Sequence, residues 1–182
     1  MAIRFAQQGD VPAILEIYRP YIEETAITFE YDVPTVAEFT ERFRSITAHC
    51  PWLVWEENGE ILGYAYGAPA FERKAYSWCA DLSVYLKKSA YGRGIGRALY
   101  AELERLLELQ GYRVLYALVT TANGPSIAFH EAVGYRKTAM FPDCGWKFGS
   151  WHGVVWLQKT IGPDTPPTQF PVPFPALLKT LE

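Results

Sequence analysis

The stretch SVYLKKSAYGRGIGRAL, residues 83–99, places three alternating glycines between a strand-like run and a helical pattern. A tight glycine turn at the start of a helix exposes main-chain N–H groups at the positive end of the helix dipole, where they can cradle phosphate oxygens. Gly92, Gly94 and Gly96 keep this approach free of side chains. The basic residues of the stretch are Lys87, Lys88, Arg93 and Arg97. The stretch therefore predicts a phosphate-binding turn.

Two common phosphate-binding motifs do not fit this turn. A Walker P-loop ends in Gly-Lys-Ser/Thr, whereas Gly96 is followed by Arg97 and Ala98. A dinucleotide-binding turn usually opens its domain and is followed about 20 residues later by an acidic residue, and the region around Tyr116 has none. On the glycines alone, a solvated turn without a ligand remains an alternative.

Composition limits the class of protein. The 182 residues are 49% hydrophobic and 15% aromatic, which is enough apolar material for one core. The net charge of -3 comes from interspersed residues, so we predict neither nucleic acid nor membrane as a partner. Cys50, Cys79 and Cys144 lack the spacing of a zinc site or a disulfide framework, so we predict reduced thiols and no metal. Without a long apolar segment, the sequence predicts a cytoplasmic protein.

Hydrophobic periodicity and turn signals predict a mixed α/β fold. Thr35 and Glu38 have capping-box spacing, and Asn58–Gly59 is a strong hairpin signal. Strands are predicted at 3–5, 52–56, 61–66, 76–86, 113–119, 135–140 and 154–159. Helices are predicted after the N-cap Asp10, after Thr35 towards His49, before Gly111 and between Asn123 and Gly134.

The end of the chain has a different composition. From Gly162 it reads GPDTPPTQFPVPFP, which is too rich in proline for a central strand. We therefore predict one domain over residues 1–160 and an extended tail over 161–182, which packs back through Phe170 and Phe174.

At the glycine turn, Tyr91-Gly92-Arg93-Gly94-Ile95-Gly96 resembles the acetyl-coenzyme A motif of the GNAT N-acetyltransferase superfamily. Tyr91 departs from that motif, which usually has Gln or Arg there. Four further blocks resemble, in order, those of the phosphinothricin and methionine sulfoximine N-acetyltransferases: CPWLVWEENGEILGYAYGAP (50–69), AYSWCADLSVYL (75–86), NGPSIAFHEAVGY (123–135) and GWKFGSWHGVVWLQ (145–158). The resemblance covers residues 1–160.

The resemblance implies a GNAT-like central twisted mixed sheet flanked by helices, with a splayed strand pair for the pantetheine arm of acetyl-coenzyme A. It also implies the residues that hold this co-substrate. They are Val84, Tyr85 and Leu86 through the main chain, Gly92, Arg93, Gly94, Ile95, Gly96 and Arg97 at the diphosphate, and Asn123 and Ser126.

The resemblance further implies direct acetyl transfer to a primary amine. Asp81 matches a glutamate regarded as general base in relatives; it is one methylene shorter, so it would reach the amine through an ordered water or a shifted strand. His130 lies where many members have a tyrosine proposed to protonate the thiolate. A structural hydrogen-bond acceptor at Asp81 and an idle surface imidazole at His130 are the alternatives.

For the acceptor, the resemblance implies a small L-amino acid or analogue of the phosphinothricin, methionine sulfoximine or methionine sulfone type. The implied substrate-binding residues are Phe29, Arg73, Tyr76 and Trp78, with Lys147 and His152 as weaker candidates. The alternatives are a different amine (a polyamine, an aminoglycoside or a peptide) or a binding module that holds acyl-coenzyme A without turnover. Relatives commonly form homodimers, and the aromatic residues Trp146, Trp151, Trp156 and Phe170 could cover such an interface.

Overall fold

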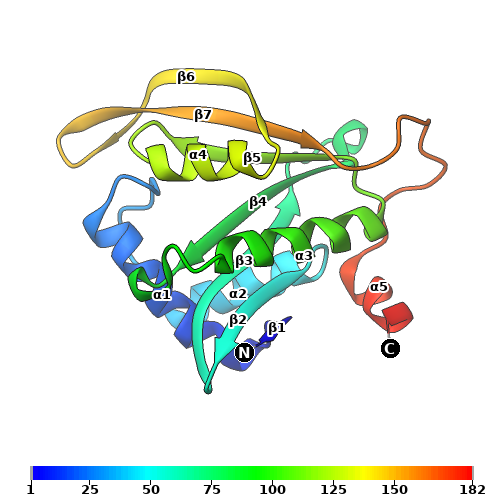
Figure 1. The fold of residues 1–182 in the computed structure, drawn as a ribbon, viewed down its shortest axis with the longest axis horizontal. Helices are drawn as coiled ribbons and strands as arrows, with labels where there is room; N and C mark the ends of the chain where they lie inside the picture. Colours follow the sequence, from blue (N-terminus) through cyan, green and yellow to red (C-terminus); the bar gives the residue numbers. More distant parts are fainter. Residues whose placement is uncertain (1, 182) are drawn as a thin grey trace.

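The computed structural model describes residues 2–181, which form one seven-stranded sheet flanked by helices (Figure 1). The strands are β1 (Ala2–Phe5), β2 (Trp52–Glu57), β3 (Glu60–Pro69), β4 (Cys79–Leu86), β5 (Val114–Thr120), β6 (Arg136–Lys147) and β7 (Ser150–Thr160). The helices are α1 (Val11–Glu24), α2 (Val36–Thr47), α3 (Ile95–Gln110), α4 (Gly124–Ala132) and α5 (Phe174–Leu181), with short 3-10 turns at Gln8–Asp10, Lys74–Tyr76 and Lys88–Ala90. The mixed fold predicted from the sequence is confirmed.

The strand order is β1-β2-β3-β4-β5-β7-β6, and every neighbouring pair is antiparallel except β4 and β5. Among residues 2–181, no helix combines the length and the apolar composition that crossing a bilayer requires.

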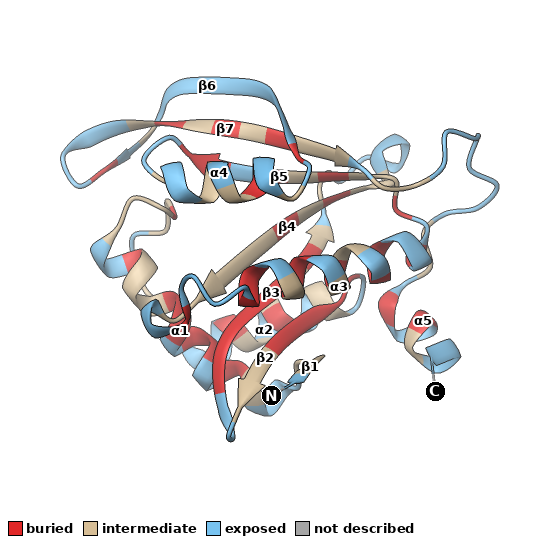
Figure 2. Ribbon diagram, viewed as in Figure 1, coloured by how far each residue is buried: buried red, intermediate tan, exposed pale blue. Residues whose placement is uncertain are grey.

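Helices cover both faces of the sheet. On one face, Leu99, Leu103 and Leu107 of α3 are fully buried in the same core as residues of β3, β4 and β5. On the other face, α1 and α2 bury a second core, in which Phe39 and Phe43 pack against Trp52. Figure 2 shows β2 and β3 buried along much of their length, whereas β6 is exposed. The edge strand β6 is therefore the least covered part of the sheet.

Two hairpins have two-residue turns. Asn58 and Gly59 both have positive φ, 50° and 78°, as a type I′ turn requires, so this predicted hairpin is confirmed. A second turn at Phe148 and Gly149, with φ of 50° and 72°, joins β6 to β7. The sequence did not predict this hairpin, because phenylalanine is an unusual residue at positive φ. Both strands are consequently longer than predicted.

The helix ends follow most of the sequence signals. The capping box of Thr35 and Glu38 is formed, and Gly111 ends α3 in the left-handed conformation at φ 96°. Asp10 occupies the N-cap position of α1, but its carboxylate does not cap the helix. It accepts two hydrogen bonds from Arg4, at 2.7 and 2.9 Å. A bidentate, charge-assisted pair is stronger than a neutral capping bond, which explains the difference.

The C-terminal segment is not extended throughout. Residues 174–181 form α5, in which Phe174 packs on Phe5 with ring centroids 5.1 Å apart and Leu177 joins the core around α3. The expected packing through Phe174 is confirmed, but the extended conformation predicted from the prolines is wrong for α5. Proline is compatible with the first turn of a helix, where its missing N–H costs nothing, and Pro175 stands there.

Candidate active site

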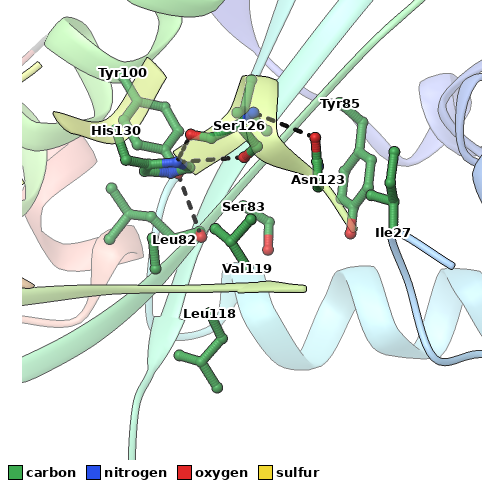
Figure 3. Close-up of a pocket in the computed structure, with 12 residues that line it drawn as sticks. Ile27, Leu82, Ser83, Tyr85, Tyr100, Leu118, Val119, Asn123, Ser126 and His130 are labelled. Carbon is green, nitrogen blue, oxygen red and sulfur yellow. Dashed lines mark hydrogen bonds between the residues drawn. The ribbon is translucent and has the colours of Figure 1, made fainter. Parts of the chain in front are cut away.

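The cleft originates between β4 and β5. These parallel strands pair only from Cys79↔Val114 to Asp81↔Tyr116. Beyond that point β4 runs on to Leu86 and β5 to Thr120 without pairing to each other. The narrow inner end of the gap is shown in Figure 3, and the wider outer part has a volume of about 430 Å³ and extends to the glycine turn.

The register with β3 decides which main-chain groups of β4 face the cleft. The N–H of Lys87 donates to the carbonyl of Leu62 at 2.9 Å, so the main-chain groups of Lys87 face β3. Because antiparallel pairs alternate, the N–H and C=O groups of Val84 and Leu86 point away from β3 and into the gap. Those of Tyr85 face β3, so only its side chain lines the cleft.

Tyr21 of α1 occupies part of this free edge. Its hydroxyl donates to the carbonyl of Leu86 at 2.6 Å, accepts from the Leu86 N–H at 3.3 Å, and lies 2.7 Å from the hydroxyl of Tyr91. Within residues 2–181, Val84 is therefore the cleft-facing residue of β4 whose main-chain groups have no partner. Sequence reasoning missed Tyr21, because it lies 65 residues upstream of its partner Leu86.

The glycine turn has the geometry of an anion cradle. Gly92 and Gly94 have positive φ, 72° and 80°, and a Cβ added at either would meet no atom within 4 Å. Gly94 is the N-cap of α3 and has no side chain to cap it. The N–H groups of the first turn, from Ile95 to Arg97, are therefore available to a ligand. The side chain of Ile95 itself is buried in the core.

Most basic side chains around the turn form ion pairs. The pairs are Lys87–Glu60, Lys88–Glu24 and Arg93–Glu57, with N–O distances of 2.6, 2.8 and 2.6 Å. Arg97 has no ion-pair partner in the part of the chain that the structure describes. Surface ion pairs contribute at most about 1 kcal/mol, so a phosphate group can compete for these cations.

Asn123, Ser126 and His130 of the α4 region line the inner cleft. Asn123 caps α4 by accepting from the Ser126 N–H at 3.2 Å. His130 is buried, with Nδ1 2.7 Å from the Ser126 carbonyl and Nε2 2.9 Å from the hydroxyl of Tyr100. Burial lowers the pKa of His130, and the hydrogen bond to Ser126 opposes this effect. The ring is buried, so the surface position given as an alternative is wrong.

Asp81 lies on the opposite face of β4 from Leu82 and the α4 residues. Its Oδ1 atom is out of contact with water and has no hydrogen-bond partner within residues 2–181. Burial raises the pKa of Asp81 to about 7, and the main-chain N–H of Leu82 acts in the opposite direction. A carboxyl group that titrates near neutrality suits proton abstraction from an amine.

Two of the expected acceptor residues, Tyr76 and Arg73, lie in the loop that precedes β4. Tyr76 packs on Phe71 with centroids 4.7 Å apart, and Phe71 contacts Tyr116, the residue opposite Asp81 in register. Arg73 precedes Tyr76 in the same exposed loop between β3 and β4.

Trp78 and Phe29 pack against other segments of the chain. The indole N–H of Trp78 donates to the Gln169 carbonyl at 3.1 Å, and its ring stacks on Phe170 at 5.1 Å, so it faces the C-terminal segment. Phe29 fills the space beside Gly145, where an added Cβ would come within 2.3 Å of its ring. The structure thus brings Tyr76 and Arg73 together but separates them from Trp78.

Lys147 fixes the β6–β7 hairpin instead of offering a free charge. Its buried ammonium group donates to the carbonyls of Ile22 and Thr28 at 2.7 and 2.9 Å. Burial lowers the pKa of Lys147. His152, the other weaker candidate, lies 3.0 Å from the Lys147 carbonyl through Nε2.

Comparison with known proteins agrees with this geometry. Residues 3–156 match a family model described as an acetyltransferase (GNAT) domain. The chain belongs to the GNAT acetyltransferase family. As a GNAT protein, it is an acetyl-coenzyme A-dependent N-acetyltransferase, which confirms the resemblance seen in the sequence.

Several relatives of this GNAT chain have named activities. A phosphinothricin N-acetyltransferase of Streptomyces viridochromogenes is 33% identical over 165 residues, covering 91% of this chain and 90% of the relative. An L-methionine sulfoximine/L-methionine sulfone acetyltransferase of Salmonella typhimurium is 31% identical over 170 residues, covering 92% and 98%. The crystal structure of a GNAT superfamily phosphinothricin acetyltransferase from Sinorhizobium meliloti in complex with acetyl-coenzyme A superposes with a TM-score of 0.90 at 34% identity, covering 95% and 96%.

The residues of the cleft fit acetyl-coenzyme A, the acyl donor of GNAT enzymes. The turn at Gly92 and Gly94 leaves room for a diphosphate, and the unpaired main-chain groups of Val84 suit an amide of the pantetheine arm. Within residues 2–181, no three His, Cys, Asp or Glu side chains gather as a metal site would require.

The cradle generates a prediction for Gly94→Ala. The methyl group occupies the space of the diphosphate and forces alanine into positive φ, so the Kd for acetyl-coenzyme A should rise at least about tenfold in calorimetry, equivalent to roughly 1.4 kcal/mol. The matched control is Gly59→Ala, because Gly59 has nearly the same φ, 78°, and equally open surroundings. Equal affinity losses in the two variants would contradict a cradle at Gly94.

Proposed function

We propose that this enzyme transfers the acetyl group of acetyl-coenzyme A directly to the primary amine of a small L-amino acid or analogue, such as phosphinothricin, methionine sulfoximine or methionine sulfone. The single observation that carries the chemistry is the buried, unpartnered carboxylate oxygen of Asp81 at the point where β4 and β5 separate. The acceptor class is supported by the relatives with these activities in their names, which align over more than 90% of this chain.

The proposal assigns a proton-transfer role to each side of β4. Asp81 takes a proton from the acceptor ammonium group, so that the neutral amine can attack the thioester carbonyl carbon. The attacking nitrogen then loses its second proton to water, the carbon–sulfur bond breaks, and the leaving thiolate takes a proton from the His130 side of the cleft. No covalent enzyme intermediate is needed. Strand alternation supports this division, because Asp81 and Leu82 point to opposite faces of β4 and Tyr100, on the side of Leu82, contacts His130.

The acceptor site in this proposal lies over Asp81. Arg73 is proposed to bind the acidic group of the acceptor, and Tyr76 and Phe29 to contact its carbon chain. Support comes from the packing of Tyr76 on Phe71, in contact with Tyr116. Trp78 contributes by anchoring this loop, since its ring is stacked on Phe170.

An amine panel tests the proposed function. Purified protein and acetyl-coenzyme A are mixed with free amino acids, their sulfone, sulfoximine and phosphinate analogues, polyamines, aminoglycosides and peptides, and thiol release is followed. We expect the highest kcat/KM with the analogues. Preference for a polyamine, an aminoglycoside or a peptide would assign a different acceptor. Tight acetyl-coenzyme A binding with no thiol release for any amine would instead identify a binding module.

The role of Asp81 predicts a pH dependence. The base must be ionised, so the wild-type rate should rise as the pH increases through about 7 and then level off. Asp81→Asn should lower kcat by about 100-fold or more without changing the Kd for acetyl-coenzyme A. Asp143→Asn, in the exposed strand β6, is the matched control.

Stability measurements separate loss of the base from misfolding. The folded state keeps a proton on Asp81 up to about pH 7, whereas the unfolded chain releases it near pH 3.8. The fold therefore loses stability as the pH rises between these values. Asp81→Asn should remove that loss and unfold at a higher denaturant concentration at pH 8. A fully active Asp81→Asn enzyme would exclude this residue as the base.

We also propose a homodimer built on the exposed β6–β7 arm. The arm is the edge of the sheet and exposes Met140, Trp146, Phe148 and Trp151, a combination that favours association with a second copy. In sedimentation velocity, Trp151→Arg should shift the protein from dimer to monomer. Val36→Arg, at a half-exposed site on α2, should not. A wild-type protein that is monomeric at high micromolar concentration would refute the proposal.

We also propose that the protein is located in the cytoplasm. Cys50, Cys79 and Cys144 are all free thiols in the structure, which supports a reducing compartment.

A further inference from the structure

The imidazole of His130 is enclosed on both of its nitrogen atoms. Nδ1 lies 2.7 Å from the Ser126 carbonyl, and this oxygen can only accept, so Nδ1 carries a proton. Nε2 lies 2.9 Å from the Tyr100 hydroxyl and is the acceptor of that bond in the neutral ring. The ring is 3% exposed. His130 therefore has no N–H of its own directed at the cleft.

Tyr100 of α3 lines the inner end of the cleft together with His130. Its hydroxyl is also 3.4 Å from the carbonyl of Leu82, which alternates with Val84 and so points into the gap between β4 and β5. Figure 3 shows Tyr100, His130 and Ser126 joined in this way at the inner end of the cleft. The Tyr100 ring is held edge-to-face against Phe129 and His130, each at 5.3 Å. The hydroxyl position is thus fixed by packing.

We propose that Tyr100 is a catalytic residue that meets the leaving thiolate and relays to it the proton of His130. This inference rests on the proposed function. Once His130 has taken up a proton from water, Nε2–H donates to the Tyr100 oxygen, and the Tyr100 O–H is released towards the cleft. As the carbon–sulfur bond breaks, the Tyr100 proton passes to sulfur and the Nε2 proton passes to the Tyr100 oxygen. The products are a thiol, an intact tyrosine and a neutral imidazole.

The Tyr100 hydroxyl can form a hydrogen bond with His130 in both protonation states of the imidazole. Burial favours the neutral imidazole in the free enzyme, whereas a thiolate forming at the cleft favours the protonated ring. The Tyr100 hydroxyl suits both states, because it donates to Nε2 in the first and accepts from it in the second. The sequence offered no signal for this role, since tyrosine in an amphipathic helix is usually a core residue.

A double-mutant cycle tests the relay. Tyr100→Phe keeps the ring and removes the hydroxyl, and we expect kcat to fall by about 10- to 100-fold with an unchanged KM for acetyl-coenzyme A. His130→Asn should have a similar effect, and the double variant should lose no more than either single variant. The matched control is Tyr135→Phe, because Tyr135 packs edge-to-face on the same imidazole at 5.4 Å and its hydroxyl has no partner within residues 2–181. Losses that multiply in the double variant, or a fully active Tyr100→Phe enzyme, would overturn the proposal.

The leaving group provides a readout that a structural role would not change. An acetyl thioester of an acidic aromatic thiol needs little proton donation, so the activity deficit of Tyr100→Phe should largely disappear with this donor. A deficit of equal size with both donors would overturn the relay. If the wild-type enzyme acetylates no amine, the proposed function fails instead, and this outcome is distinct from an active Tyr100→Phe variant.

Nitrogen-15 NMR of the three histidines tests the hydrogen bonds without any substrate. We expect His130 to have a protonated Nδ1 and a hydrogen-bonded, unprotonated Nε2 at neutral pH. Tyr100→Phe should shift the Nε2 resonance of His130 alone, leaving His49 and His152 unchanged. An Nε2–H tautomer in the wild-type protein would overturn the proposed direction of the hydrogen bond.

Discussion

The site depends on a short stretch of parallel pairing. β4 and β5 share a register only from Cys79 to Asp81, and after that each strand has a free side. The separation creates a cleft while the helices still cover both faces of the sheet. Main-chain groups that a complete sheet would pair with one another are instead available to a ligand. The free edge of Val84 and the open turn at Gly94 are two parts of the same ligand-binding surface.

Strand alternation divides the chemistry between the two faces of β4. Asp81 faces the aromatic side of the sheet with Tyr116, whereas Leu82 faces α3 and the pair formed by Tyr100 and His130. Burial raises the pKa of Asp81 and lowers the pKa of His130. Each group is thereby shifted towards its neutral form. The sheet itself separates the proposed proton acceptor from the proposed proton donor.

Local signals in the sequence predicted the fold well. The hairpin at Asn58–Gly59, the capping box at Thr35 and the stop at Gly111 are all encoded within a few residues. The failures concern the ends of elements, where a competing contact or a short turn replaces the expected structure. Asp10 was expected to cap α1, but Arg4 of β1 holds its carboxylate. The strand expected over 76–86 begins only at Cys79, since Tyr76 lies in a 3-10 turn.

At the site, the residues that could be predicted are those with a local sequence signal. Gly92 and Gly94 were recognisable from their spacing, and the structure places them as an open turn. Tyr21 and Tyr100 could not be identified, because each acts through a hydrogen bond to a distant segment, at Leu86 and at His130. Hydrophobic periodicity gives no information about their hydroxyl groups, because tyrosine is counted there as an apolar residue.

The C-terminal segment has a practical consequence for anyone who works with isolated GNAT domains. The family model ends at residue 156, yet Leu177 of α5 belongs to the core around α3. The side chain of Gln110, at the end of α3, donates to the carbonyls of His49 and Val172 at 2.7 Å each and so ties both segments to that helix. A protein that ends at residue 156 would lack α5 and would expose the apolar surface on which Leu177 packs. Such a surface promotes aggregation. The packed core around α3 therefore extends beyond the residues that the family model matches.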